Sequence, residues 1–515
     1  MFAMLLDGFR TIFSTPSVLL TCFAGCILGT FIGALPGIGS ATGVAVLLPL
    51  IYGKDPLTSL VMLSGIFSGT MFGGAISSIT LNIPGTSAAA ATTFDGYPLA
   101  RSGQAGKAIG MSAIASFLGG TIATILLCCV GIPLSKFALK FGPPEYFAVY
   151  LLTFVVILTL TEANFLKTCI ALIFGLLLST VGADPITGAG RLTFGSVELL
   201  SGIDYLPAII GLFGMSEVLI NLSKPNDGSV IDCGSPYTRY SLKNILPSFH
   251  DIRFCLPSIL RQGLFGFIIG ALPGAGASIA TMAGYSLEKR FLKDSENFGK
   301  GDIRGVAAPE SADNGSAIGS YVPLLSLGIP GSATSALLLG AFVILGIQPG
   351  PLLFTEHPDV VGGLIASMYV GNVVLLIINT AFIPLFVVLL DKSKKIISVV
   401  VSCFCIIGVY ALRNSMFDVL LMIAFAGIGV FFKVIGIPIA PTVIALVLGS
   451  DLEHSFRQTL QMTRGQFGAV FSRPLFVILF ILSVIFVVMP AVKKITQTRK
   501  KRLGSASDTG SDTEP

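Results

Sequence analysis

Long stretches without any charged residue dominate the chain. No Asp, Glu, Lys or Arg occurs within residues 11–53, 56–94 or 314–355. A membrane-spanning helix needs about 20 apolar residues, so each run is long enough to cross or re-enter a bilayer about twice. The pattern therefore favours membrane helices.

Hydropathy predicts an all-α polytopic membrane protein with about 10–14 membrane segments, many of them interrupted by Gly and Pro. Segments are expected near residues 14–32, 37–52, 57–74, 108–133, 144–160, 165–182, 203–220, 257–284, 315–346, 363–390, 396–411, 416–432, 435–449 and 474–491.

Composition excludes a soluble multidomain protein of this size. Of the 515 residues, 53% are hydrophobic and 11% charged, and the mean hydropathy is +0.87. An ordinary globular chain is about 25% charged, so lipid must cover much of this surface. The net charge is +5, to which the basic tail contributes much, and a general surface for nucleic acid is not supported.

One polar stretch divides the chain almost in half. We expect a first transmembrane repeat at 1–222, a polar cytoplasmic linker at 223–256 and a second transmembrane repeat at 257–491. A basic, disordered cytoplasmic tail is expected at 492–515.

The two halves resemble each other in sequence. Three segments recur in the same order at nearly constant spacing: 33–40 (GALPGIGS) as 270–277 (GALPGAGA), 83–88 (IPGTSA) as 329–334 (IPGSAT) and, more weakly, 202–217 as 436–451. Recurrence of this kind indicates an internal repeat.

Loop charges predict that the repeat is inverted. Lys and Arg gather in loops 95–107 and 288–304, whereas the matching loops 348–359 and 52–56 have no excess of them. Because Lys and Arg mark the cytoplasmic side, corresponding loops fall on opposite sides, as in many secondary transporters. The loop with Arg457, Arg464 and Arg473 does not fit this assignment.

The recurring motifs break membrane helices. Proline removes a hydrogen-bond donor, glycine permits close approach, and the half-helix that follows directs free N–H groups at the break. A lone Pro-Gly is more often a packing kink, but paired breaks at corresponding positions indicate a transport site. The predicted substrate-binding residues are Pro36, Gly37, Gly39, Ser40, Asn82, Pro84, Gly85, Thr86, Ser87, Pro273, Gly274, Gly276, Pro330, Gly331 and Ser332.

A second group of polar residues stands before the run 314–355. Glu310, Asp313 and Asn314 could couple transport to an ion, either by binding Na⁺ through their oxygens or by carrying a proton on Asp313. The matching first-half segment 64–68 has no acid. The alternative is that Asp313 or Ser311 only caps a helix at the membrane interface.

Enzymatic chemistry finds little support. No GxxxxGK[ST] motif occurs, no Cys/His spacing suggests a metal site, and no nucleophile–base pair is apparent at membrane depth. We assign no catalytic or metal-binding residues, and we expect no cofactor beyond a transported Na⁺ or H⁺. Asp95, with Arg101 and Lys107, is interpreted as loop structure and as a signal of membrane topology.

Five motifs together resemble one transporter family. Residues 33–40, 72–86 (FGGAISSITLNIPGT), 94–101 (FDGYPLAR), 307–314 (AAPESADN) and 327–332 (LGIPGS) resemble the large membrane subunit of the tripartite tricarboxylate transporters, the TctA type. The resemblance implies a bacterial inner-membrane protein that works with a small TctB-type membrane subunit and a periplasmic TctC-type solute-binding protein. It also implies sodium- or proton-driven uptake of a carboxylate such as citrate.

The predicted function is therefore ion-gradient-driven import of tricarboxylates or related carboxylates. A passive channel or an exporter for organic anions is the alternative, and an intramembrane enzyme is a remote one.

Overall fold

The computed structural model describes residues 1–35, 39–51, 53–161, 164–184, 187–223, 246–292, 294–382, 399, 401–411 and 413–488. Most of the predicted linker (224–245) and the whole predicted tail lie outside these ranges, as do Pro36 and Gly37.

The described chain is almost entirely helical, which confirms the all-α prediction. Its one small sheet pairs β1 (Gly182–Ala183) with β2 (Gly190–Arg191) in antiparallel fashion. Eight helical segments among the described residues are long and apolar enough to cross a membrane: α2 (Pro16–Ala34), α4 (Pro56–Leu81), α5 to α6 (Ala90–Ala138), α7 (Pro143–Leu160), α9 to α10 (Tyr205–Ser223), α12 (Phe249–Gly270), α18 (Pro358–Ala381) and α20 (Met416–Ile435).

The described chain also contains shorter apolar helices. They span Ser40–Ile51, Phe165–Ser179, Ala333–Ile344, Val401–Ala411 and Pro474–Val488. α1 (Phe2–Ser14) packs beside α18, and α21 (Ile439–Met462) packs against α7 and α8 (Phe165–Ser179). Large apolar side chains such as Leu20, Ile173, Ile268 and Leu420 are exposed, as expected where lipid covers the protein.

Glycines bring α2 and α4 into close backbone contact. A Cβ added at Gly29 would lie 2.4 Å from the carbonyl oxygen of Ile66, and one at Gly33 would lie 2.3 Å from that of Thr70. No side chain fits at such distances, so only glycine allows this approach, as is common between membrane helices.

The same contacts recur between α12 and α14 (Arg304–Gly319) in the second half. A Cβ at Gly266 would lie 2.2 Å from the carbonyl oxygen of Ala312, and one at Gly270 would lie 2.1 Å from that of Ser316. These glycines stand 237 residues after Gly29 and Gly33, and their partners stand 246 residues after Ile66 and Thr70. The helix pairs of the two halves therefore pack alike; their opposite orientation in a membrane stays a prediction.

The helices are interrupted at all four predicted motifs. α2 ends at Ala34 and α12 at Gly270, while α4 ends at Leu81 and α15 spans Tyr321–Leu327. The cap residues that follow α4 and α15, Asn82 and Gly328, are both in the left-handed conformation. The next helices are α3 (Ser40–Leu47), α13 (Gly276–Phe291), α5 (Ala90–Leu99) and α16 (Ala333–Ile344).

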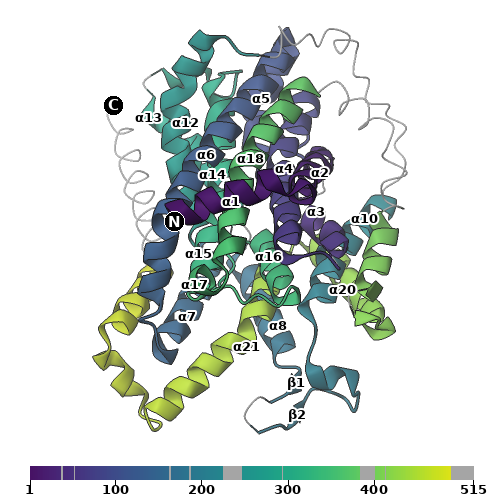
Figure 1. Cartoon of the computed structure of the whole chain (residues 1–515), viewed down its shortest axis with the longest axis vertical. Helices are drawn as coiled ribbons and strands as arrows, with labels where there is room; N and C mark the ends of the chain where they lie inside the picture. The colour runs from purple at the N-terminus through teal and green to yellow at the C-terminus, as the bar shows by residue number, and fades with distance from the viewer. Residues whose placement is uncertain are drawn as a thin grey trace, which may run out of the picture.

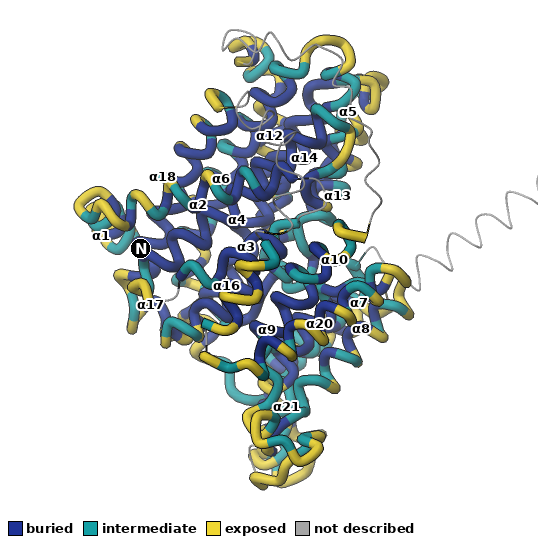
Figure 2. The backbone as a smooth tube through the Cα atoms, turned by 90° about the vertical axis from the view of Figure 1, so that its right-hand side faces the viewer, coloured by how far each residue is buried: buried dark blue, intermediate teal, exposed yellow. Residues whose placement is uncertain are grey.

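Figure 1 places α5, α12 and α13 toward one end of the molecule, and the small sheet at the opposite end. α3 and α16 lie between these ends. α4 and α14 are almost wholly buried in the interior, while exposed segments concentrate at the periphery (Figure 2). The four helix breaks are therefore held by a buried helical framework.

Asp95 lies in a helix and not in the loop that we expected. It lies within α5, fully buried, and its Oδ1 accepts hydrogen bonds from the backbone N–H groups of Gly299, Gly301 and Asp302 at 2.8–2.9 Å. Its Oδ2 accepts a 2.8 Å bond from the hydroxyl of Tyr285 on α13. The loop interpretation was wrong, because this carboxylate joins α5 to α13 and to the loop that follows α13.

Candidate functional site

A cavity of about 490 Å³ lies where the four helix breaks meet. Every one of the four motifs contributes predicted residues to its wall: Gly39, Ser40, Thr86, Ser87, Gly274, Gly276, Gly331 and Ser332. The volume lies within the range of known ligand pockets. Residues almost 300 positions apart in sequence thus form one site.

Helix N-termini face this cavity. α3, α13 and α16 all begin in its wall, and the turn that leads into α5 also lines it. The first N–H groups of a helix lack acceptors within the helix and carry a partial positive charge. Several such ends around one cavity favour the binding of an anion such as a carboxylate.

Hydroxyl groups bind backbone N–H groups at two of these breaks, in the turn before α5 and at the start of α16. The backbone N–H of Ala89 donates to Thr86 Oγ1 at 3.2 Å, and that of Ser335 donates to Ser332 Oγ at 3.1 Å. Ser332 and Ser335 form a reciprocal capping box at the start of α16. Both predicted hydroxyls therefore stabilise local structure as well as lining the cavity.

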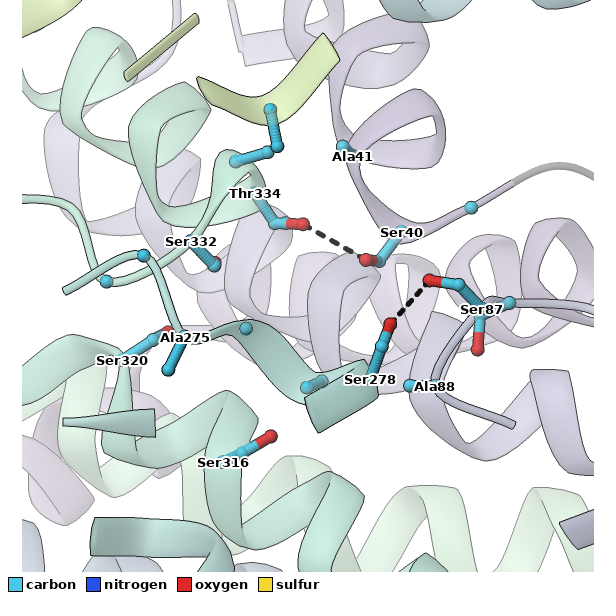
Figure 3. Close-up of a pocket in the computed structure, with 18 of the residues that line it drawn as sticks. Ser40, Ala41, Ser87, Ala88, Ala275, Ser278, Ser316, Ser320, Ser332 and Thr334 are labelled. Carbon is cyan, nitrogen blue, oxygen red and sulfur yellow. Dashed lines mark hydrogen bonds between the residues drawn. The ribbon is translucent and has the colours of Figure 1, made fainter. Parts of the chain in front are cut away.

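Two hydrogen bonds join the halves across the cavity (Figure 3). Ser40 Oγ lies 3.0 Å from Thr334 Oγ1, and Ser278 Oγ donates to Ser87 Oγ at 2.8 Å. Ser278 and Thr334 were not among the predicted residues. The sequence offered a sign of both residues. Ser278 is a hydroxyl residue directly after the recurring motif 270–277, and Thr334 is the last residue of the recurring motif 329–334.

Other predicted residues do not line the cavity. They are Asn82, Pro84, Gly85, Pro273 and Pro330, while Pro36 and Gly37 lie outside the described residues. Gly85 instead packs against α2, since a Cβ there would lie 2.1 Å from the carbonyl oxygen of Gly33. Asn82 adopts a φ of 57° where α4 ends. These residues shape the breaks.

The predicted coupling residues lie inside α14, behind the cavity wall. Glu310 is buried and accepts hydrogen bonds from Thr92 Oγ1 at 2.5 Å and Ser116 Oγ at 3.1 Å. Asn314 Nδ2 donates to the carbonyl of Glu310 at 3.3 Å. The capping alternative for Asp313 and Ser311 was wrong, because both residues lie in the middle of the helix, away from its ends.

Among the residues that the structure describes, Asp313 has no charge partner. Its side chain is buried, and neither carboxylate oxygen has a hydrogen-bond partner within the described part of the chain. Ser316, one turn further along α14, and Ser320, the residue directly after α14, line the cavity. A buried carboxylate without a partner is strongly disfavoured, so Asp313 at this position calls for a proton or a bound cation.

The charged residues of the cavity wall were missed from sequence. They are Glu217 and Lys433, whose Oε2 and Nζ lie 2.6 Å apart. Glu217 closes the weakest of the three recurring segments, but Lys433 lies three residues before the start of its counterpart. No local motif marked the lysine.

Comparisons with known proteins agree with this architecture. A family profile described as the tripartite tricarboxylate transporter TctA family matches residues 19–444. An uncharacterised 52.8 kDa protein in the TAR-I ttuC' 3' region of Agrobacterium vitis is 39% identical over 494 residues, which cover 96% of this chain and 97% of that protein. An uncharacterised protein in the TAR-II ttuC' 3' region of the same organism is 37% identical over 234 residues, 45% of this chain and 97% of that protein. No solved structure gives a significant match. The chain therefore belongs to the TctA family of tripartite tricarboxylate transporters, and it is a multi-pass membrane protein with a transport role.

Proposed function

We propose that this chain is the carrier subunit of an importer for tricarboxylates or related carboxylates, driven by a gradient of Na⁺ or H⁺. Family membership supports a tricarboxylate transport role. The observation that carries the proposal is the single cavity lined by all four broken-helix motifs. The N–H groups and hydroxyls around the cavity can donate hydrogen bonds to carboxylate oxygens, so a Lys or Arg is not needed at each of the four breaks.

The proposed coupling site is Asp313 with Glu310 and Asn314. Asp313 is buried one turn behind the cavity wall and has no hydrogen-bond partner among the described residues, so occupancy of its carboxylate by H⁺ or Na⁺ would alter the charge close to the substrate. No other cofactor is part of the proposal. Symport follows if substrate and ion favour the same conformation of the carrier.

The proposed setting is the bacterial inner membrane, with a small TctB-type membrane subunit and a periplasmic TctC-type binding protein as partners. The binding protein would deliver the carboxylate, and movement of one part of the chain against another would expose the cavity to each side in turn. The matched packing of α2–α4 and α12–α14 supports a repeat of the kind on which such movement is often based.

The test is uptake of radiolabelled citrate and a small panel of other carboxylates by cells that express this chain with its two presumed partners. Parallel assays with and without sodium, and with a protonophore, identify the coupling ion. Accumulation above the external concentration that depends on this chain supports the importer. Equilibration without accumulation indicates a passive channel, and enhanced efflux indicates an exporter.

A further inference from the structure

The ion pair of Lys433 and Glu217 forms the charged part of the cavity wall. Among the described residues that line the cavity, these two are the ones with a formal charge. Their side chains are 25% and 14% exposed, so neither is sealed in the protein interior. The pair leaves the cavity neutral overall, although the ligand proposed for it is an anion.

The pair lies on the same side of the cavity as the start of α3. Glu217 is in the first turn of α10 (Ser216–Ser223), and Phe213 lies one turn before it. Thr42 in α3 donates a 3.3 Å hydrogen bond to the carbonyl of Phe213. This hydrogen bond joins the segment that carries Glu217 to the start of α3, where Ser40 contacts Thr334.

We infer that Lys433 binds a carboxylate of the substrate, and that Glu217 occupies the ammonium group until the substrate displaces it. The inference rests on the proposed function and deepens it. Helix N–H groups would hold one carboxylate near Ser40, and Lys433 would hold a second. The site then selects substrates with at least two carboxylates, since a monocarboxylate cannot satisfy both positions.

If Lys433 exchanges Glu217 for a substrate carboxylate, the presence of an ion pair in the wall of an anion-binding cavity is explained. A lysine ammonium has three donors and no acceptor, so it stays paired while it exchanges one carboxylate for another. The displaced Glu217 carboxylate loses this ion pair, but its side chain is 14% exposed at the cavity wall, which lessens the cost of leaving it without a cation. Glu217 competes with the substrate for these donors. Its negative charge therefore weakens binding, whereas the positive charge of Lys433 strengthens it.

A purely structural ion pair makes the opposite prediction for one variant. If the pair only held α10 against α20, removing either charge would leave the other unpaired and would weaken folding and binding alike. Under the exchange mechanism, Glu217→Gln frees Lys433 for substrate and tightens binding. The two single variants thus separate the explanations by the direction of their effects.

The experiment measures equilibrium binding of radiolabelled citrate to the purified full chain in lipid nanodiscs. We expect binding about tenfold weaker in Lys433→Gln and about tenfold tighter in Glu217→Gln, because a hydrogen bond to a charged group accounts for roughly one decade in affinity. Lys167→Gln is the matched control. Lys167 donates to the carbonyl of Ile435 at the end of α20, but it does not line the cavity, so binding should be unchanged.

Thermal melting and size-exclusion profiles of each variant verify folding, and Lys433→Arg retains the charge if Lys433→Gln is unstable. Weaker binding in both Glu217→Gln and Lys433→Gln would overturn the exchange mechanism. Citrate binding that is the same in all variants would also overturn it while leaving the proposed function intact. Failure of the wild type and Glu217→Gln to bind either citrate or succinate would contradict the proposed function itself.

Discussion

The hydroxyl groups of Ser40 and Thr334 lie 3.0 Å apart, although 294 residues separate them in sequence. Each residue stands in the first turn of a helix, Ser40 in α3 and Thr334 in α16. Their contact brings two positive helix ends from different halves of the chain to one side of the cavity. Any ligand held there is bound by both halves at once.

Replacement of Ser40 by Ala should weaken substrate binding without preventing folding. We expect a roughly fivefold rise in the KM for uptake, since a hydrogen bond contributes on the order of 1 kcal/mol. Initial uptake rates over a range of substrate concentrations provide the measurement. Ser472→Ala, which removes an exposed hydroxyl far from the cavity, should behave as wild type. An unchanged KM in Ser40→Ala would argue against a ligand at this helix start.

Asp313→Asn should separate binding from coupling. The variant keeps the shape of the side chain but can no longer carry an ionised carboxylate, so gradient-driven accumulation should be lost while citrate binding persists. Stability should not fall, because the wild-type carboxylate has no partner among the described residues. Uptake, binding and thermal melting are compared with those of Asp359→Asn, an exposed acid in the first turn of α18. Accumulation at the wild-type level would exclude Asp313 from coupling.

Gly266→Ala should destabilise the packing of α12 on α14. The new Cβ would lie 2.2 Å from the carbonyl oxygen of Ala312, so the helices must separate, at a cost of about 1–3 kcal/mol. Thermal unfolding followed by size-exclusion chromatography in detergent reports the loss. Gly427→Ala is the matched control, since that glycine is in α20 and has no neighbour within 4 Å of an added Cβ. Equal melting temperatures for the two variants would show that the close contact is not needed.

Asp95→Ala should destabilise the protein more than Tyr285→Phe. Removal of the carboxylate leaves three backbone N–H groups without their acceptor, each at a cost of about 1–3 kcal/mol if it stays buried. Tyr285→Phe removes one of the four hydrogen bonds to Asp95 and should cost about 1 kcal/mol. Melting temperatures of the two variants give the order. A larger loss in Tyr285→Phe would mean that Asp95 does not hold the loop.

The breaks in the helices could be predicted because their cause is local. Proline and glycine act on their own turn of backbone, so the motifs at 33–40 and 83–88, with their repeats, marked the interruptions directly. Gly29 and Gly33 are four residues apart and so lie on one face of α2, where they contact α4. The structure shows that Gly266 and Gly270 make the matching contacts in the second half.

The roles of individual side chains were harder to predict. Asp95 has the composition of a loop around it, with Gly96 and Pro98 beside it, yet it is buried in a helix because distant N–H groups surround its carboxylate. Ser311 and Asp313 resembled caps because the charge-free run 314–355 begins directly after them in the sequence. In the structure α14 begins earlier, at Arg304, and carries them through its middle.

The sequence by itself determined that this is a helical membrane protein of the TctA type, with a repeat and four broken helices. These properties depend on composition and on the conformational limits of neighbouring residues. Only the tertiary structure decided which residues meet: Ser87 with Ser278, Thr92 with Glu310, and Glu217 with Lys433. Such pairs join positions about 190–220 residues apart, and helix packing, which no local pattern encodes, sets the distance between them.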